Sequence, residues 1–183
     1  PPTLLSSWQR EEYTRNAIGK GLQSLNLSSN DVVMLSDVDE IPRAECVVAC
    51  ARALTNREAE CFVFQQVLSY YYVNCRSDYL WQGTRMIRHQ DLTTMHALRA
   101  RGGINVKEGG WHFSYLGGIE RIREKIGATS HTELDRPEYR EEAHLQHCLA
   151  EGSDLFGRGI HFQFEALGPT FPRHLMENQD RFR

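Results

Sequence analysis

The sequence predicts a mixed α/β fold, because segments with helical periodicity alternate along the chain with short segments typical of strands. Its 183 residues, 40% hydrophobic and 25% charged, are enough for one domain with a buried core. No internal repeat or low-complexity linker divides the chain. We therefore expect a single domain over residues 1–183, in which helices flank a mostly parallel sheet.

The first third of the chain predicts a helix, a strand and a second helix. Ser6 and Gln9 match a capping box, and apolar residues then recur at helical spacing to about Asn26. Residues 31–35 are dominated by a continuous apolar run, which is typical of a strand buried on both faces, as in parallel sheets. Residues 43–56 carry apolar and cysteine side chains on one helical face, which predicts the second helix.

The middle of the chain predicts strands separated by a short helix. Residues 60–73 are rich in β-branched and aromatic side chains, and residues 79–89 also favour a strand. Asp91 is the expected N-cap of a short helix that ends near residue 102. After two glycines, residues 111–115 alternate like a strand.

The last third predicts helices. Three isoleucines within residues 119–126 form the apolar stripe of a helix that we expect Gly127 to close. Asp135, as an N-cap, and the proline two positions later open a helix that we expect to run to about Gly152. The tail from about Pro169 predicts one more helix on the outside.

Charge and composition exclude some partners. The formal net charge of −3, without a run of five like charges, gives no reason to expect nucleic acid or an anionic membrane surface as a partner. No window approaches the roughly 18 consecutive apolar residues of a membrane span, so we expect no membrane segment within this chain. The cysteines lack C-x-x-C spacing and predict buried free thiols. They are Cys46, Cys50, Cys61, Cys75 and Cys148.

The acidic end of the first predicted strand is the strongest functional signal. In the stretch VVMLSDVDEIP, residues 32–42, four apolar residues lead into Asp37, Asp39 and Glu40. Two acids at i and i+2 after a strand can converge on Mg²⁺ or Mn²⁺, which prefer oxygen ligands. Alternatively, one acid caps the next helix and the others are solvated. A further alternative is an aspartyl-phosphate phosphatase, in which the first acid of this pattern is the nucleophile.

A set of motifs in a fixed order resembles glycosyltransferase family 17, which includes the transferase that adds bisecting GlcNAc to N-glycans. The resemblance covers most of the chain, from about Trp8 to Arg183. The motifs are RNAI at residues 15–18, SDVDEIPR at 36–43, YYYVN at 70–74, WQG at 81–83, GGWHFSYLGG at 109–118 and SHTE at 130–133.

The resemblance implies a GT-A type nucleotide-sugar transferase that inverts the anomeric carbon. The donor would be UDP-GlcNAc, the acceptor a mannose or other sugar hydroxyl of an N-glycan type of glycan, and the cofactor Mn²⁺ or Mg²⁺. Asp37 and Asp39 would hold the metal against the donor diphosphate, with His112 as the first candidate for a further ligand. Because only one helix precedes the acidic strand, we expect the first N-terminal βα units of that fold to be missing, as in an N-terminally truncated domain.

The resemblance also implies roles for other residues. Glu133 and Asp135 are candidates for the catalytic base, and Glu40 either orients the acidic loop or contacts the donor sugar. The expected substrate contacts lie in several segments, and each has an alternative as a core or surface residue. They are Arg15 and Asn16 on the first helix, Arg43 after the acidic cluster, and Trp81, Trp111 and His112 on predicted strands.

Two questions stay open at the level of the sequence. Without its base-binding half, the chain could instead be a non-catalytic sugar-binding module or a degenerate transferase. The compartment would be the Golgi lumen for an animal-type homologue whose anchor lies upstream, and the cytoplasm for a microbial one.

Overall fold

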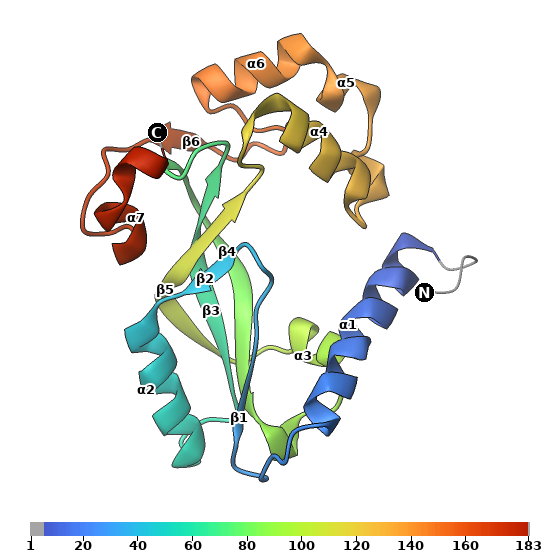
Figure 1. Ribbon diagram of the computed structural model, residues 1–183, viewed down its shortest axis with the longest axis vertical. Helices are drawn as coiled ribbons and strands as arrows, with labels where there is room; N and C mark the ends of the chain where they lie inside the picture. The colour runs from blue at the N-terminus through green and yellow to red at the C-terminus, as the bar shows by residue number, and fades with distance from the viewer. Residues whose placement is uncertain (1–5, 183) are drawn as a thin grey trace. The chain divides into compact units, whose positions relative to one another are not determined.

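The computed structural model describes residues 6–182 and shows a mixed α/β fold with a six-stranded sheet (Figure 1). The strand order is β1-β4-β3-β5-β2, and β6 also pairs with β4. The chain forms two compact units, which we describe separately. Within the described residues, unit 1 comprises 6–66 and 82–110, and unit 2 comprises 67–81 and 111–182.

Three long strands contribute residues to both units, and the other elements belong to one. The long strands are β3 (Cys61–Tyr70), β4 (Cys75–Arg88) and β5 (Ile104–Ser114). Unit 1 also contains α1 (Ser7–Gln23), β1 (Val32–Leu35), β2 (Glu40–Pro42), α2 (Ala44–Thr55) and α3 (Met95–Ala100). Unit 2 also contains α4 (Gly118–Ala128), α5 (Pro137–Arg140), α6 (Glu142–Glu151), β6 (Phe162–Phe164) and α7 (Arg173–Glu177).

The expectation of a mostly parallel sheet is wrong for four of the strands. β1 pairs with β4 in antiparallel register, with Val32 opposite Arg88, and β6 pairs with β4 in the same sense. β3 and β4 are neighbours joined by only four residues, a connection that can link only antiparallel strands. β1 is not buried on both faces either, since Met34 is exposed between the buried Val33 and Leu35. An antiparallel strand with one solvated face needs only such alternation.

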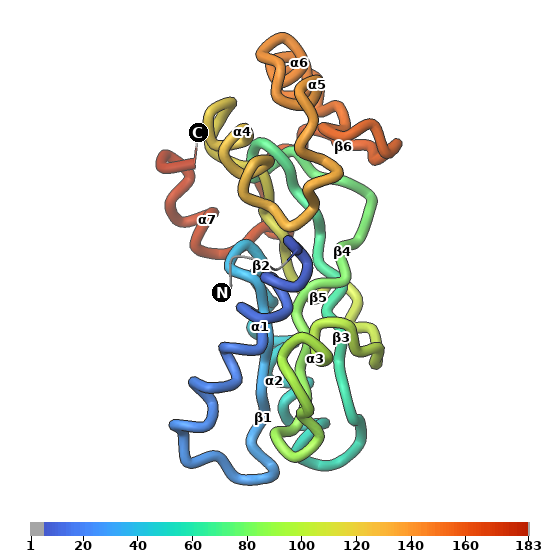
Figure 2. The backbone as a smooth tube through the Cα atoms, turned by 90° about the vertical axis from the view of Figure 1, so that its right-hand side faces the viewer, coloured from blue at the N-terminus to red at the C-terminus, as the bar shows by residue number. Residues whose placement is uncertain are grey.

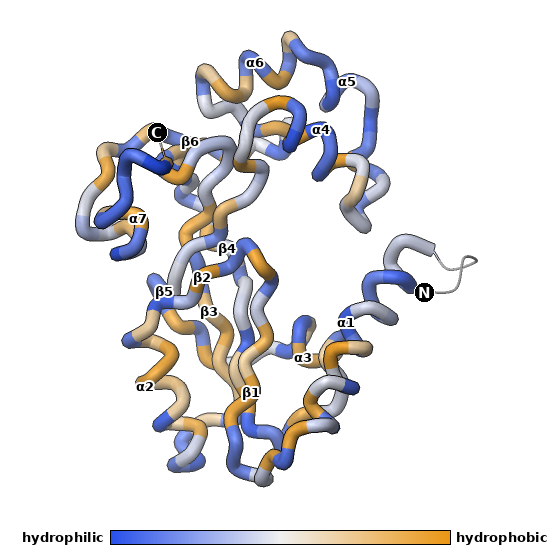
Figure 3. Tube along the Cα trace, viewed as in Figure 1, coloured by the Kyte–Doolittle hydropathy of each residue, from blue (hydrophilic) through white to orange (hydrophobic). Residues whose placement is uncertain are grey.

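The core of unit 1 lies around α2 and α3. Leu54 of α2 packs with Phe64 and Met86, while Leu98 of α3 packs in a second cluster with Ile87. Figure 3 shows the corresponding orange segments along α2, β1 and β3. α1 begins at the predicted capping box, and it packs against α3 (Figure 2). The predicted helices at the start of the chain are therefore confirmed.

The core of unit 2 is built from the predicted isoleucine stripe and aromatic rings. Ile122 and Ile126 of α4 are fully buried with Leu145 of α6. A smaller cluster holds the C-terminal tail, where Leu175 of α7 packs with Phe171. The helices predicted at the isoleucine stripe and in the C-terminal tail are therefore confirmed.

Three predicted helix ends are wrong. Thr94 caps α3 in place of Asp91, and Asp91 instead pairs with Arg88. Asp135 precedes the N-cap of α5 by one residue, and the predicted long helix breaks at Glu141, whose backbone is extended. Gly127 lies inside α4, which ends one residue later.

The cysteines are free thiols. Four of the five are buried, as predicted, but Cys46 is only half-buried, so the prediction is wrong for it. Burial raises the pKa of Cys50 and of Cys75 to about 11, which keeps both thiols protonated near neutrality. None of the helices in residues 6–182 is long and apolar enough to cross a membrane.

Candidate functional site

The acidic residues of unit 1 form a tight turn between β1 and β2. The backbone N–H of Glu40 donates to the carbonyl of Asp37 at 3.0 Å, which closes the turn. The backbone N–H of Asp37 in turn donates to Oε2 of Glu40 at 3.1 Å. Val38, at the tip, is fully exposed, while Asp39 is half-buried. The sequence thus places two carboxylates at the rim of the turn and a third beneath it.

Glu40 is the buried base of this turn. Its carboxylate is fully buried and receives two hydrogen bonds from the guanidinium of Arg99 on α3, at 2.7 and 3.3 Å. This fork geometry is the strong form of an Arg–carboxylate pair, and it also compensates a charge that burial alone would penalise. Of the two roles expected for Glu40, the structure therefore supports the one in which it orients the loop.

A polar network from the sheet holds the Glu40 carboxylate in place. The hydroxyl of Thr84 donates to Oε2 of Glu40 at 3.4 Å and lies 2.7 Å from the Ser36 hydroxyl. Gln66 hydrogen-bonds to both the backbone and the side chain of Thr84. A Cβ on Gly83 would collide with the Gln66 amide oxygen, so the glycine of the WQG motif makes room for this network.

Asp37 lies between two guanidinium groups. Oδ2 is 3.0 Å from Nη2 of Arg99, and Oδ1 is 3.4 Å from Nη1 of Arg15 on α1. Arg15 also pairs with Glu11 at 3.0 Å. These charges help the chain to tolerate three acids within four positions, because two arginines from separate helices offset part of the negative charge of the turn.

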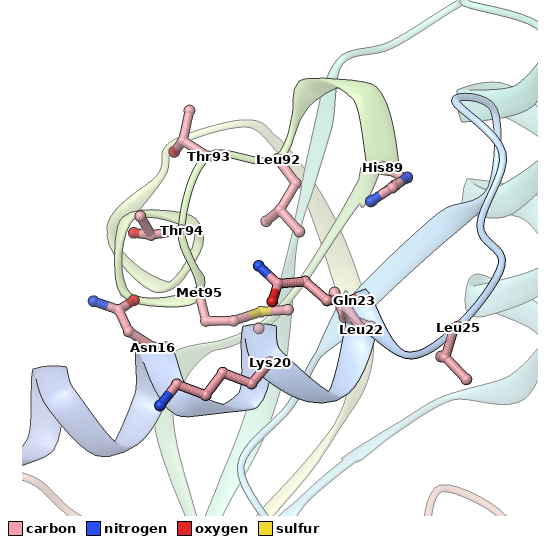
Figure 4. A pocket seen from close by; sticks show the side chains of 11 residues that line it. Asn16, Lys20, Leu22, Gln23, Leu25, His89, Leu92, Thr93, Thr94 and Met95 are labelled. Carbon is pink, nitrogen blue, oxygen red and sulfur yellow. The ribbon is translucent and has the colours of Figure 1, made fainter.

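Asn16 has a different environment from its neighbour Arg15. Its Oδ1 accepts a hydrogen bond from the backbone N–H of His96 at 2.9 Å, which ties α1 to α3. It also lines a pocket of about 530 Å³ between α1 and the segment 89–95, and Figure 4 shows Lys20, Gln23 and Thr94 among the side chains of its lining. This pocket belongs to unit 1, as the acidic turn does.

Arg43 fixes the chain that leaves the turn. Its backbone N–H donates to the Gly109 carbonyl at 2.8 Å, and its Nε donates to the Glu108 carbonyl at 3.0 Å. The adjacent Gly110 has φ +152°, and a Cβ there would collide with the Ile41 carbonyl. The double glycine therefore lets β5 approach this segment closely.

The predicted aromatic and histidine residues lie in unit 2. Trp111 and His112 are buried on β5, and the indole N–H of Trp111 donates to the Thr170 carbonyl at 2.9 Å. The rings of Trp81 and His112 meet edge to face at 4.7 Å. For Trp111 the structure supports the alternative of core packing, because its polar atom already has a protein partner.

The two candidates for the catalytic base lie near the 3-10 turn Thr132–Leu134 of unit 2. Glu133 is exposed and 2.7 Å from Nδ1 of His131, and this hydrogen bond lowers the pKa of the Glu133 carboxyl. Asp135 pairs with Arg140 at 2.8 Å. Both carboxylates are therefore held by a basic neighbour, and their catalytic role stays a prediction.

The expected metal ligands do not form a cluster of side chains in the described residues. Within residues 6–182, no group of three or more His, Cys, Asp or Glu side chains is placed to hold a metal ion. Asp37 and Asp39 lie on the turn of unit 1, and His112 lies in unit 2. Two carboxylates fit a magnesium-type site that takes its other ligands from substrate phosphates and water, but they do not form a closed protein cage.

Arg99 is a residue of the candidate site that the sequence did not indicate. It contacts Asp37, Glu40 and the Gly83 carbonyl, the last at 2.7 Å. Nothing in its local pattern marks it, because it is far from the acidic turn in sequence. Only the packing of α3 in unit 1 brings it there.

The family comparison covers nearly the whole chain. The family described as Glycosyltransferase family 17 matches residues 3–183. Comparisons with curated proteins and with solved structures gave no match.

Proposed function

Since the chain belongs to glycosyltransferase family 17, we propose that it transfers N-acetylglucosamine from UDP-GlcNAc to a mannose or other sugar hydroxyl of an N-glycan type of acceptor, with inversion. The family establishes a glycosyltransferase, with a nucleotide sugar and an acceptor as its substrates. That membership favours glycosyl transfer over the phosphatase alternative. The donor, the acceptor, the stereochemistry and a GT-A type of site are the proposal.

The observation that carries this proposal is the acidic turn held by Arg99. Asp37 and Asp39 stand at the rim of the turn, while the buried Glu40 and Arg99 fix the backbone beneath them. A rigid pair of carboxylates at a strand end is the arrangement needed to receive a divalent ion together with a diphosphate. The turn is thus the candidate donor site.

The metal would be Mn²⁺ or Mg²⁺, held by Asp37 and Asp39, and it would supply charge stabilisation for the departing diphosphate. The protein residues have separate tasks. Arg15 and Arg99 orient Asp37 and offset part of the negative charge of the turn. The buried Glu40 keeps Arg99 in its fork geometry.

The acceptor hydroxyl needs a base, and Glu133 or Asp135 remains our candidate. The lowered pKa of Glu133 keeps it ionised near neutrality, so it is in the form that accepts a proton. His131 is hydrogen-bonded to Oε1 of Glu133, so it competes with the acceptor hydroxyl for this oxygen. We expect Glu133→Gln to lower transfer more than donor binding if Glu133 is the base.

The proposal is tested by calorimetric titration of UDP-GlcNAc into the chain with Mn²⁺ and then with EDTA. We expect metal-dependent binding that Asp39→Asn weakens at least about tenfold, because one of two protein ligands is lost. Glu58→Gln is the matched control, since it removes an exposed carboxylate of unit 1 outside the turn. Equal binding by Asp39→Asn and Glu58→Gln would overturn the donor site.

Hydrolysis of UDP-GlcNAc in the same samples separates transfer from mere sugar binding. A transferase consumes donor slowly in water, whereas a sugar-binding module leaves it intact. Binding of glycans without donor consumption would therefore replace the proposed function by the non-catalytic alternative.

A further inference from the structure

Unit 2 contains a second pocket that the donor site does not use. Its volume is about 610 Å³, within the range of roughly 300–1,000 Å³ typical of small-molecule sites. It lies beside β4, which pairs with β6 only over Cys75–Ser77, so that the following residues have no β6 partner. The residues that matter here are Tyr70, Asp78, Tyr79, Trp81, Arg158 and His161.

Aromatic rings form the wall of this pocket. Tyr79 and Trp81 are at i and i+2 on β4, which places them on one face of the strand. Tyr79 is 50% exposed, and Tyr70 is buried and stacked on Phe162 at 4.7 Å. The exposed ring of Tyr79 and the fixed ring of Tyr70 both line the pocket, and each tyrosine combines a flat apolar surface with a hydroxyl at its edge. Such a surface suits the C–H face of a pyranose.

Arg158 is held at the pocket by a preorganised loop. The carboxylate of Asp154 accepts hydrogen bonds from the backbone N–H groups of Phe156, Arg158 and Ile160. Nη2 of Arg158 donates to Asp154 at 2.9 Å and to the Tyr70 hydroxyl at 3.3 Å. Its guanidinium also lies 4.9 Å from the Phe156 ring centroid. The side chain therefore needs little ordering when a ligand binds.

Two of the nitrogens of Arg158 remain available. Nε and Nη1 have no protein partner in residues 6–182, while the guanidinium is only partly buried. Each of these donors can serve a hydroxyl oxygen that lies in the plane of the guanidinium. Asp78, which also lines the pocket, supplies an acceptor for hydroxyl protons.

The charge balance indicates a neutral ligand. Arg158 is paired with Asp154, and Asp78 adds a second carboxylate, so the pocket has no surplus positive charge for a diphosphate. The donor nucleotide is thus a poor occupant. A neutral sugar combines the two features that this pocket provides, a stacking face and directional hydrogen bonds.

We propose that this pocket of unit 2 binds one pyranose of the acceptor glycan, stacked on Tyr79 and Trp81 and hydrogen-bonded by Arg158. This inference rests on the proposed function, because it assigns the pocket to the acceptor of that reaction. It names a sugar-binding site distinct in chemistry from the acidic turn. Its residues are outside the motif set, apart from Tyr70 and Trp81.

The test is a titration of the trimannosyl core oligosaccharide of N-glycans into the whole chain, with saturating UDP and Mn²⁺, in which NMR monitors binding. We expect Tyr79→Ala to raise the dissociation constant at least about tenfold, because the stacking surface is lost. Arg158→Gln should weaken binding as well. Tyr72→Ala is the matched control, because Tyr72 is 45% exposed in unit 2 but lies outside the pocket lining.

In transfer assays, Tyr79→Ala should raise the KM for the acceptor and leave UDP-GlcNAc hydrolysis unchanged. No oligosaccharide binding by the wild type, or equal weakening by Tyr79→Ala and Tyr72→Ala, would overturn the pocket assignment. Donor hydrolysis that is lost in Asp39→Asn would still support the proposed function in that case. If the wild type does not hydrolyse the donor but binds the glycan through this pocket, the pocket assignment stands and the proposed transferase function is overturned.

Discussion

The acidic turn of unit 1 and the Arg158 loop of unit 2 each contain an ion pair whose acid is buried, but the groups that they expose have opposite charges. In the turn, the Glu40 side chain is 0% and that of Arg99 16% exposed, and the group presented to solvent is Asp37 at 39%. In the loop, the acid Asp154 is 6% and the base Arg158 38% exposed. A buried acid can therefore hold an arginine that fixes a more exposed carboxylate, as Arg99 fixes Asp37, or an arginine that is itself exposed, as Arg158 is. The exposed group then decides which ligand fits.

Removing the buried acid of unit 1 should have the largest effect. Glu40→Gln leaves Arg99 without its buried countercharge, and we expect the free energy of unfolding to fall by about 3–5 kcal/mol. Urea unfolding measures this loss. Replacing both partners, as Glu40→Leu with Arg99→Met, should recover most of the stability but not donor binding. If Glu40→Gln lowers the free energy of unfolding by less than about 1 kcal/mol, the pair behaves like a surface salt bridge and not like a buried one.

Removing the buried acid of unit 2 should have a smaller, pH-dependent effect. Burial favours the protonated form of Asp154, but the hydrogen bond and charge of Arg158 outweigh it and lower the pKa of this carboxyl. Because the folded-state pKa lies below the unfolded value of about 3.9, the contribution is full above that value. It is lost as the pH falls through the folded-state pKa.

Asp154→Asn should therefore cost about 1.5–3 kcal/mol at pH near 7, the value typical of hydrogen bonds to charged groups. The difference from the wild type should shrink in the acid range below about pH 3.9. Urea unfolding across this range is the measurement. A difference that is constant with pH would argue against an ionised, paired Asp154.

The smallest effect concerns space beside the Glu40 network. Gly83→Ala introduces a Cβ that meets Gln66, and we expect a loss of about 1–3 kcal/mol from overpacking. Gly19→Ala is the control on α1, where nothing lies within 4 Å, and it should stabilise the helix by roughly 0.5–1 kcal/mol. Thermal unfolding of both variants gives the comparison. If both variants change the stability in the same direction, the result would contradict the crowding at Gly83.

Local patterns predicted the fold well where one segment decides its own structure. The capping box of Ser6 and Gln9 and the stripe of Ile122 and Ile126 are examples, because both depend on spacing within a single helix. Strand direction failed, since an apolar run such as Val32–Leu35 does not say which strand will lie beside it. The three-residue strands β2 and β6 were missed, because so few residues show no period.

The candidate site divides along the same line. Asp37, Asp39 and Glu40 were found from sequence because they are close together and follow a strand. The buried position of Glu40 and its pairing with Arg99 were not, because these depend on a helix distant in the chain. Arg158 lies in a loop and likewise gave no local signal, since its partner Tyr70 is on β3, far away in the sequence.

The pairing of β4 has a consequence for the order of folding. Its four-residue connection to β3 makes that hairpin a local contact, which costs little loop entropy and forms early. The pairings of β4 with β1 and with β6 join segments far apart in the chain, so they must form later. The edge of β4 that borders the proposed sugar pocket is therefore among the last parts to be completed, and a nascent chain would acquire its acidic turn and this pocket only after the central hairpin exists.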